Sequence, residues 1–357
     1  MPGILKQVKE APLTVLLVTL PLVVVGEVLH WPATVLFGLS ITGIVPLAHF
    51  MGVATEALAA RTGPRLGGLI NATLGNAAEL IITIIALRAG LLELVKASIT
   101  GSIMGNVLLV MGGALLLGGI RHGIQVFDRT VAGVAATQLV LAVIALGIPT
   151  LFSTAIEPRH LLVTELSLGV AVVMMVLYVL GVLFGMSNGA GVSAPAGEHA
   201  SGPAWSARRA LFILAGATVG IAVLSEILVA AIEPTVAMLG ISEFFIGIIV
   251  VPIIGNAAEH LVAITAARKN QMDLSLEIAL GSSIQIALFV APLLVFLSLL
   301  LAPEPLTLVF HPFELAALFA TALVAGFIAH DGRSNWMEGA QLLGVYLIVA
   351  LAFFFLP

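Results

Sequence analysis

Apolar segments alternate with short polar breaks along the whole chain. The breaks fall at charged, proline-rich or glycine-rich points, and the segments between them are 12–29, 33–58, 66–88, 97–118, 129–151, 161–185, 209–232, 242–267, 275–302, 312–329 and 338–356. A helix needs about 20 apolar residues to cross the hydrocarbon core of a bilayer. Since lipid cannot satisfy exposed backbone groups, such segments span as helices. The pattern predicts an all-α integral membrane protein with about eleven transmembrane helices.

The composition supports the same class of protein. Of the 357 residues, 60% are hydrophobic and 9% are charged, and the mean hydropathy is +1.19, whereas about 25% of an average soluble domain is charged. Lipid must therefore cover most of the lateral surface. The net charge of -5 comes without a basic patch, so we expect no nucleic-acid partner. With no cysteine, the chain has neither disulfides nor thiolate chemistry.

The basic residues indicate the direction in which the segments cross. If the N-terminus is cytoplasmic, eleven of the 14 fall on the cytoplasmic side, namely Lys6, Lys9, Arg61, Arg65, Arg121, Arg129, Arg208, Arg209, Arg268, Lys269 and Arg333. The other three, Arg88, Lys96 and Arg159, fall on the opposite side. Cytoplasmic loops are enriched in Lys and Arg. This sorting favours a cytoplasmic N-terminus.

A five-residue motif occurs twice and indicates a duplication. "GNAAE" is found at residues 75–79 and 255–259, an offset of 180 residues, and at this offset residues 67–110 and 247–290 share 14 identities in 44 positions. Because five spans, an odd number, separate equivalent helices, the two copies must cross in opposite directions. Inverted repeats of this kind are typical of alternating-access transporters.

The repeat and the polar breaks together predict the domain organisation. We expect an N-terminal transmembrane helix in residues 1–32, a first five-helix repeat in 33–185 and a second in 209–357. Residues 186–208, which are rich in Gly, Ala, Ser and Pro, have the composition of a flexible linker.

The repeated motif places a carboxylate inside each of two apolar segments. A charged group at the bilayer centre costs roughly 2.5 kcal/mol or more, so it needs a partner, an ion or a proton. An amide three residues earlier and a glycine four residues earlier share its helix face: Gly75, Asn76 and Glu79, then Gly255, Asn256 and Glu259. Hard oxygen ligands suit Ca²⁺, whose charge two carboxylates would balance. Protons compete for the same oxygens, and competition at a site open to each side in turn is antiport.

Further polar residues lie near the motifs and are candidates for a supporting role. Pro252 removes a helix hydrogen bond four residues before Asn256, which would leave a carbonyl free to face an ion. Ser102 and Ser282 could orient the carboxylates or line the path. Asn106 and Gln285 lie about one turn further along and do not align with each other at the 180-residue offset.

The two motif regions resemble a known transporter family. "GLINATLGNAAELII" and "GIIVVPIIGNAAEHLVAI", followed by "GSIMGN" and "GSSIQIALFV", are similar to the two repeats of the cation/proton exchanger family within the calcium/cation antiporters. The resemblance implies an eleven-helix inverted-repeat fold that exchanges cytosolic Ca²⁺ for protons. It implies that Glu79 and Glu259 bind Ca²⁺ and protons in turn beside Asn76 and Asn256. Glu56 resembles an acidic residue of the family's cytosolic entrance.

The linker departs from the eukaryotic members of that family. Those carry an acidic helix between the halves, whereas this linker has only Glu198. The departure favours a prokaryotic protein in the cell (inner) membrane. Ca²⁺, protons and the lipid bilayer are the expected partners, no cofactor is expected, and a homo-oligomer is compatible with the sequence.

Each candidate also has a simpler structural interpretation. A neutral, hydrogen-bonded glutamate can join two helices, buried amides often do so in membranes, and small serines also serve helix packing. Glu56 and Glu226 each follow a hydroxyl residue at similar places in the two halves. Either can line the ion path or lie solvated near a helix end.

Three other functions compete with Ca²⁺/H⁺ antiport. A Na⁺/Ca²⁺ or other monovalent-cation exchanger of the same superfamily is the nearest, but those relatives are richer in hydroxyls beside the site, where this chain has Ala77, Ala78, Ala257 and Ala258. A passive cation channel would not need duplicated, inverted motifs. A membrane hydrolase would need a nucleophile or zinc motif such as His-Glu-x-x-His, which the sequence lacks.

Overall fold

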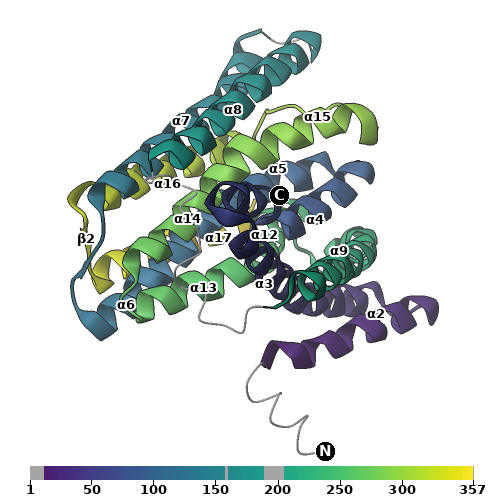
Figure 1. Cartoon of the computed structure of the whole chain (residues 1–357). Coiled ribbons are helices and arrows are strands. Elements are labelled where there is room, and N and C mark those ends of the chain that lie inside the picture. Colours follow the sequence, from purple (N-terminus) through teal and green to yellow (C-terminus); the bar gives the residue numbers. More distant parts are fainter. Residues whose placement is uncertain (1–11, 157–159, 189–204, 357) are drawn as a thin grey trace, which may run out of the picture.

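The fold is a bundle of membrane-length helices, described here from a computed structural model that covers residues 12–156, 160–188 and 205–356 (Figure 1). The first half contains η1 (Pro12–Val18), α2 (Thr19–Val28), α3 (Ala33–Leu74), α4 (Ala77–Arg88), α5 (Leu92–Met104), η2 (Gly105–Met111), α6 (Gly112–His122), α7 (Arg129–Ile156) and α8 (His160–Asn188). The second contains α9 (Ala207–Ala230), α10 (Ile232–Leu239), α11 (Glu243–Phe245), η3 (Ile246–Val250), α12 (Val251–Gly255), α13 (Ala257–Arg268), α14 (Met272–Gln285), η4 (Ile286–Val290), α15 (Ala291–Leu301), α16 (Pro312–Asp331) and α17 (Trp336–Phe354).

The number of straight spans is smaller than the sequence pattern predicts. In the described ranges, eight helices are long and apolar enough to cross a membrane, and a ninth span results if α10 and the run Glu243–Gly255, which meet at 116°, count as one. Segment 12–29 is a 3₁₀ turn followed by a ten-residue helix, 66–88 is divided between α3 and α4, and 242–267 is divided among four short elements. The break between α3 and α4 and the break between α12 and α13 fall at the two copies of the repeated motif. Most of the predicted linker, residues 189–204, lies outside the described part of the chain.

A single two-residue ladder accompanies the helices in the described ranges. Strand β1 (Gln125–Val126) pairs antiparallel with β2 (Arg333–Ser334) and joins the loop before α7 to the loop before α17. The prediction of an all-helical membrane protein is otherwise confirmed by the described elements.

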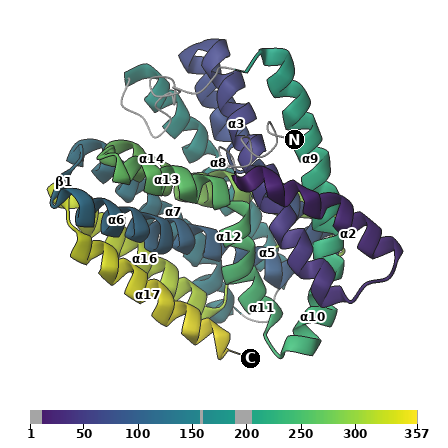
Figure 2. The same ribbon diagram turned by 90° about the horizontal axis from the view of Figure 1, so that it is seen from below.

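Helices from the two halves pack against one another. Helices α3 and α9 lie side by side, with α2 outside them (Figure 1), and α6 packs on both α13 and α17 (Figure 2). Helix α5 packs on η3 so closely that a side chain at Gly101 would collide with the carbonyl of Ile248. The central helix α5 is thereby fixed against the second half.

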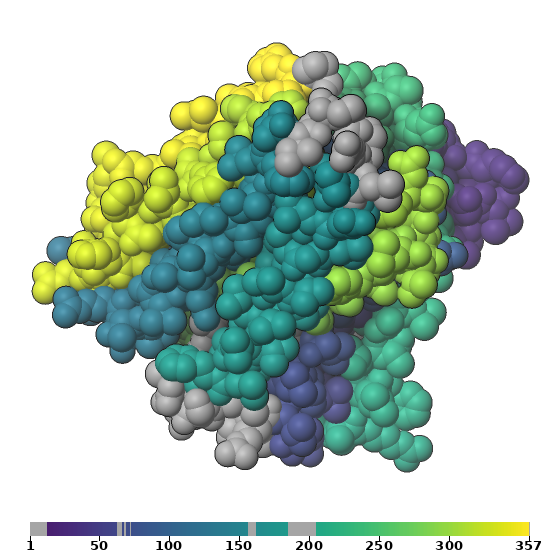
Figure 3. All heavy atoms as spheres, turned by 90° about the horizontal axis from the view of Figure 1, so that it is seen from above, coloured from purple at the N-terminus to yellow at the C-terminus, as the bar shows by residue number. Residues whose placement is uncertain are grey.

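The outer helices expose apolar side chains, as lipid contact requires. Helices α7 and α8 run as adjacent bands across one face (Figure 3). Exposed residues on α8 include Val172, Val173, Val176, Leu180 and Leu183. A soluble protein would not carry so large an apolar surface, which agrees with an integral membrane protein.

An extended segment, residues 302–311, connects α15 to α16, and we call it the strap; its first residues are exposed, whereas residues 306–310 lie between helices. Leu306, Leu308 and Phe310 point inward with at most 2% of their surface exposed. Since an extended chain in the interior cannot satisfy its own backbone groups, side chains from other helices must do so.

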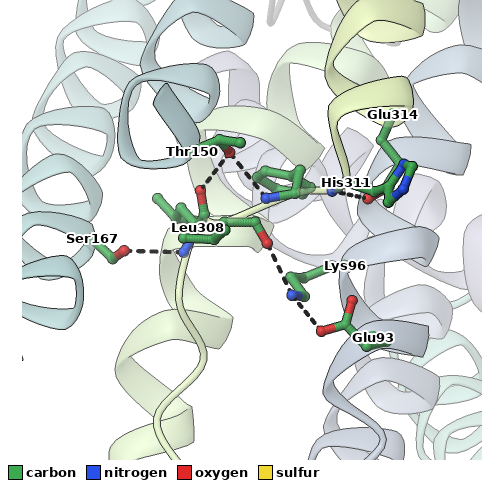
Figure 4. A network of polar contacts seen from close by, with 9 residues as sticks. Glu93, Lys96, Thr150, Ser167, Leu308, His311 and Glu314 are labelled. Atoms are coloured by element: carbon green, nitrogen blue, oxygen red, sulfur yellow. Dashed lines mark hydrogen bonds and ion pairs between the residues drawn. The ribbon is translucent and has the colours of Figure 1, made fainter. Parts of the chain in front are cut away.

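Five helices supply these hydrogen bonds, and Figure 4 shows those from α5, α7, α8 and α16. The strap N–H groups of Leu306, Leu308 and Phe310 donate to Ser298 on α15 (2.8 Å), Ser167 on α8 (3.1 Å) and Thr150 on α7 (3.0 Å), in that order. The Lys96 ammonium on α5 donates to the Val309 carbonyl at 2.9 Å and pairs with Glu93 at 2.6 Å. At the end of the strap the buried Glu314 carboxylate accepts from the His311 N–H at 2.8 Å. The strap therefore joins α5, α7, α8, α15 and α16.

Replacing Thr150 by valine should destabilise the protein, because the Phe310 N–H would be left buried without an acceptor. The cost of such a group is about 1–3 kcal/mol, which should lower the apparent melting temperature in detergent by about 2 °C or more. Thr137→Val is the matched control, because the Thr137 hydroxyl lies exposed on the same helix and bonds only the Gly133 carbonyl of its own turn. Equal melting temperatures for the two variants would contradict this account of the strap.

Candidate cation-binding site

Both copies of the repeated motif break a helix at the asparagine. Asn76 precedes α4 and Asn256 precedes α13, with φ/ψ of -96°/25° and -96°/12°. An asparagine before a helix ordinarily caps it with its side chain, but neither of these does. Their amides are therefore available to bind groups across the interface between the halves. The two helices, Ala77–Arg88 and Ala257–Arg268, begin and end at the same 180-residue offset.

Glu79 lies at the centre of the first polar cluster. Its side chain is only 3% exposed, and its Oε1 accepts hydrogen bonds from the Ser102 hydroxyl at 2.9 Å and from the Asn256 amide. Gly255 allows the Glu79 side chain to come this close to Asn256, because a Cβ on residue 255 would lie 2.5 Å from Glu79 Cγ. One carboxylate thus receives donors from both halves of the chain.

Two oxygens of this cluster have no hydrogen-bond donor among the described residues. They are Glu79 Oε2 and Asn256 Oδ1, and both are buried. Buried polar atoms are nearly always paired. A carboxylate and an amide oxygen in this situation are suitable ligands for a hard cation.

The second polar cluster is built around Asn76 on the other side of the motif pair. The Asn76 amide donates to Gln285 Oε1 at 2.9 Å, and its Oδ1 accepts from the Ser282 hydroxyl at 3.1 Å. Asn106 in turn donates to Ser282 at 3.0 Å. Asn106 and Gln285, which do not align in the sequence, therefore belong to one network.

Glu259 is in a different environment from Glu79. Its side chain is half-buried and receives no side-chain hydrogen bond from the described residues. It lies within electrostatic range of both Glu79 and the exposed Glu56 on α3. The charge of Glu259 therefore interacts with one buried and one exposed carboxylate. Glu226 is exposed on α9, and no described contact joins it to the clusters.

Pro252 and the glycines act mainly through the backbone. The Pro252 carbonyl accepts from the Asn256 backbone N–H at 3.0 Å and from its side chain at 3.2 Å, so it orients that amide. The carbonyl of Ile248, the one that Pro252 deprives of a helix donor, lies against Gly101 on α5, next to Ser102. Gly75 leaves room beside Gln285, since a Cβ there would lie 3.5 Å from its Oε1.

Two π-helical segments follow the serine-bearing helices. Helix α5, which carries Ser102, continues into η2, and α14, which carries Ser282, continues into η4. Such segments are frequent at functional sites, because the extra residue in the turn changes the direction of nearby side chains. Asn106 is in η2 and Gln285 directly precedes η4.

The chemistry of the site is that of oxygen ligands. No group of three or more His, Asp and Glu side chains in the described ranges converges as a metal cluster, so amide and hydroxyl oxygens would have to complete any cation shell. Every residue whose side chain hydrogen-bonds to the side chain of Asn76, Glu79 or Asn256 was a candidate from the sequence, whereas the connections between them were not predicted.

Comparison with known proteins identifies the family. The model of the sodium/calcium exchanger protein family matches residues 32–186 and 209–355. The chain belongs to this family of calcium/cation antiporters. It is 45% identical over 360 residues to a Ca²⁺/H⁺ antiporter of Aphanothece halophytica, with 96% of each chain covered. It is 44% identical to the Ca²⁺/H⁺ antiporter ChaA of Bacillus subtilis, with 94% of this chain and 96% of the relative covered.

A solved structure agrees with these sequence relatives. The structure of native YfkE superposes with a TM-score of 0.85 at 41% identity, and the match covers 96% of this chain and 100% of YfkE. The resemblance to cation/proton exchangers that the motifs carry is thereby confirmed over nearly the whole chain.

Replacing Ser102 by alanine should weaken cation binding, because the serine helps to hold the Glu79 carboxylate in place. A hydrogen bond to a charged group is worth about 1.5–3 kcal/mol, so we expect the half-saturating Ca²⁺ concentration to rise roughly tenfold or more. Ser98→Ala is the control: Ser98 is as buried and lies one turn earlier on α5, yet its hydroxyl contacts no described polar group. Titration of purified protein with ⁴⁵Ca²⁺ measures both. A similar change in both variants would indicate a packing effect.

Proposed function

We propose that the protein is a Ca²⁺/H⁺ antiporter, a secondary active transporter and not an enzyme, that uses the proton gradient to export Ca²⁺ from the cytosol. The observation that carries the proposal is the buried Glu79 carboxylate beside Asn256, with an acceptor oxygen on each that lacks a donor among the described residues. The Ca²⁺/H⁺ antiporters related over nearly their full length support the choice of ions. Since those relatives are prokaryotic, we place the protein in a prokaryotic cell membrane.

Glu79 and Glu259 are the residues that exchange the ions. Two carboxylates balance the charge of Ca²⁺, and Asn76, Asn256, Ser102 and Ser282 supply neutral oxygens near them. When Ca²⁺ leaves, two adjacent buried carboxylates repel each other and lose hydration, so protons take its place. Either Ca²⁺ or protons can neutralise the two carboxylates. A site that holds neither has two buried negative charges and is therefore high in free energy. The protein then crosses between its two open states only with Ca²⁺ or with protons bound, which couples the two fluxes.

Glu56 marks the cytosolic approach to the site. It is exposed on α3, and its charge acts on Glu259. A negative charge at this point would attract Ca²⁺ from solution toward Glu259. Glu226 has a corresponding place on α9. We propose that it lines the ion path between the site and the non-cytosolic side of the membrane.

The finer topology is also a proposal. The N-terminus lies in the cytoplasm, and eleven chain crossings, three of them through broken helices, form two inverted five-helix repeats after the N-terminal helix. The equal 180-residue offset of α4 and α13 supports the duplication. The separate matches of the family model to residues 32–186 and 209–355 are compatible with two halves.

Glu79→Gln and Glu259→Gln should each abolish Ca²⁺ exchange while leaving the protein folded. Glutamine keeps the shape of the side chain but neither binds a proton nor balances Ca²⁺, so we expect a loss of about 100-fold or more in uptake by proteoliposomes. Glu304→Gln, at an exposed carboxylate between α15 and α16, is the control. Transport at the wild-type rate in either site variant would remove that residue from the mechanism.

Gradient-resolved flux tests the coupling ion. In everted vesicles, Ca²⁺ uptake should require an inward-acidic pH gradient, stop when that gradient is collapsed, and be unaffected by Na⁺. Uptake that survives the collapse but needs a Na⁺ gradient would establish the sodium-coupled alternative. Uptake that needs neither gradient would indicate a passive channel.

Cysteine labelling tests the inverted topology, because the chain has no cysteine of its own. Ala89 and Lys269 are equivalent at the 180-residue offset, and both are exposed at the ends of α4 and α13. Ala89→Cys should react with an impermeant maleimide only from outside the cell, and Lys269→Cys only from the cytoplasmic side. Labelling of both from one side would contradict the inverted arrangement.

A further inference from the structure

The two sequence-equivalent halves of the site do not make equivalent hydrogen bonds. Glu79 receives one donor from its own half, Ser102, and one from the other half, Asn256. At the 180-residue offset, the corresponding donors for Glu259 are Ser282 and Asn76. Neither of them donates to Glu259.

Gln285 accepts the hydrogen bond from Asn76 that, if the two halves were equivalent, the Glu259 carboxylate would accept. The Asn76 amide donates to Gln285 Oε1 at 2.9 Å, just as the Asn256 amide donates to Glu79 Oε1. The Ser282 hydroxyl donates at 3.1 Å to Asn76 Oδ1. Glu259, without these donors, is half-buried and lies within electrostatic range of Glu56.

The first half has no side chain that could do the same. The residue equivalent to Gln285 is Gly105, so nothing at that position competes with Glu79 for the Asn256 amide. The asymmetry of the hydrogen bonds therefore accompanies two differences in the sequence, Gln285 against Gly105 and Asn106, which donates to Ser282, against Ile286. As a result Glu79 accepts from two side chains, whereas Glu259 accepts from no side chain among the described residues.

We propose that Gln285 is a positioning residue that holds Asn76 while Glu259 is withdrawn, and that Glu259 displaces it from Asn76 when both carboxylates close on the cation. The proposal rests on the proposed function. Without Gln285, the Asn76 amide would be buried without an acceptor whenever Glu259 leaves, which is unfavourable. A carboxylate is the stronger acceptor, so Glu259 takes the donor when it returns.

Gln285 borders a small crevice between α7, α8 and α14 that is lined by Gln138, Tyr178, Gly181 and Val182. The π-helical η4 begins at the next residue.

Gln285→Met tests the proposal, because methionine keeps the length of the side chain and removes the amide. Loss of the acceptor should disfavour the state with Glu259 withdrawn, so Ca²⁺ should bind more tightly and leave more slowly. A net hydrogen bond corresponds to roughly a two- to tenfold effect. We expect the dissociation constant for ⁴⁵Ca²⁺ and the maximal exchange rate in proteoliposomes both to fall by about that factor.

Gln138→Met is the matched control, since it removes an amide from the same crevice without touching Asn76. It should leave the Ca²⁺ dissociation constant unchanged. Gln285→Leu carries the same expectation as Gln285→Met and replaces it if that variant does not fold.

Two outcomes would overturn the proposal. A rise in the dissociation constant would make Gln285 a direct Ca²⁺ ligand, and a lower exchange rate with unchanged binding would indicate a packing role. Failure of the proposed function is separate, because it would appear in the wild-type protein as Ca²⁺ uptake that does not depend on the pH gradient.

Discussion

The buried Glu79 carboxylate is the constraint on which the rest of the architecture depends. A charge at this depth has to be stabilised by donors, a proton or a cation, and the chain provides donors by bringing two broken helices together. Asn256 and Ser102 reach Glu79 only because Gly255 has no side chain to occupy the space. The helix breaks at the motifs are thus necessary for the site. An unbroken helix would leave its asparagine side chain pointing along its own surface.

Close packing around the site keeps these donors in place. Gly101 lets α5 meet η3 in direct backbone contact, which fixes the helix that carries Ser102. At its other end α5 holds the strap through Lys96, and the strap is also bonded to α7, α8 and α15. By contrast, Glu259 lies on α13 near the exposed Glu56 of α3. The two carboxylates therefore differ in how firmly they are held, although their motifs are identical.

The sequence predicted the chemistry of the site better than its geometry. Hydropathy found the apolar segments, and the repeated "GNAAE" found Glu79 and Glu259, because a carboxylate in an apolar run is costly and two copies at one offset require an explanation. Hydropathy did not reveal that the segments at 66–88 and 242–267 are broken, since a break at Asn76 or Asn256 leaves the mean hydropathy unchanged. The buried Lys96 and Glu314 were also missed. Their signal, a charged residue at the edge of an apolar segment, is the same as that of a solvated helix end.

The connections between polar residues could not be predicted, because they depend on which helices face one another. Sequence alignment of the halves separates Asn106 from Gln285, yet both join the network around Asn76 and Ser282. Identical motifs with different neighbours need not be in the same state. A transporter with two fully equivalent halves would hold both carboxylates equally firmly, and opening toward one side would then require breaking bonds that are no weaker than those on the other. The second half has Gln285 where the first half has Gly105. This difference removes the equivalence at the Asn76 amide, and Glu259 is therefore the carboxylate that the protein releases more readily.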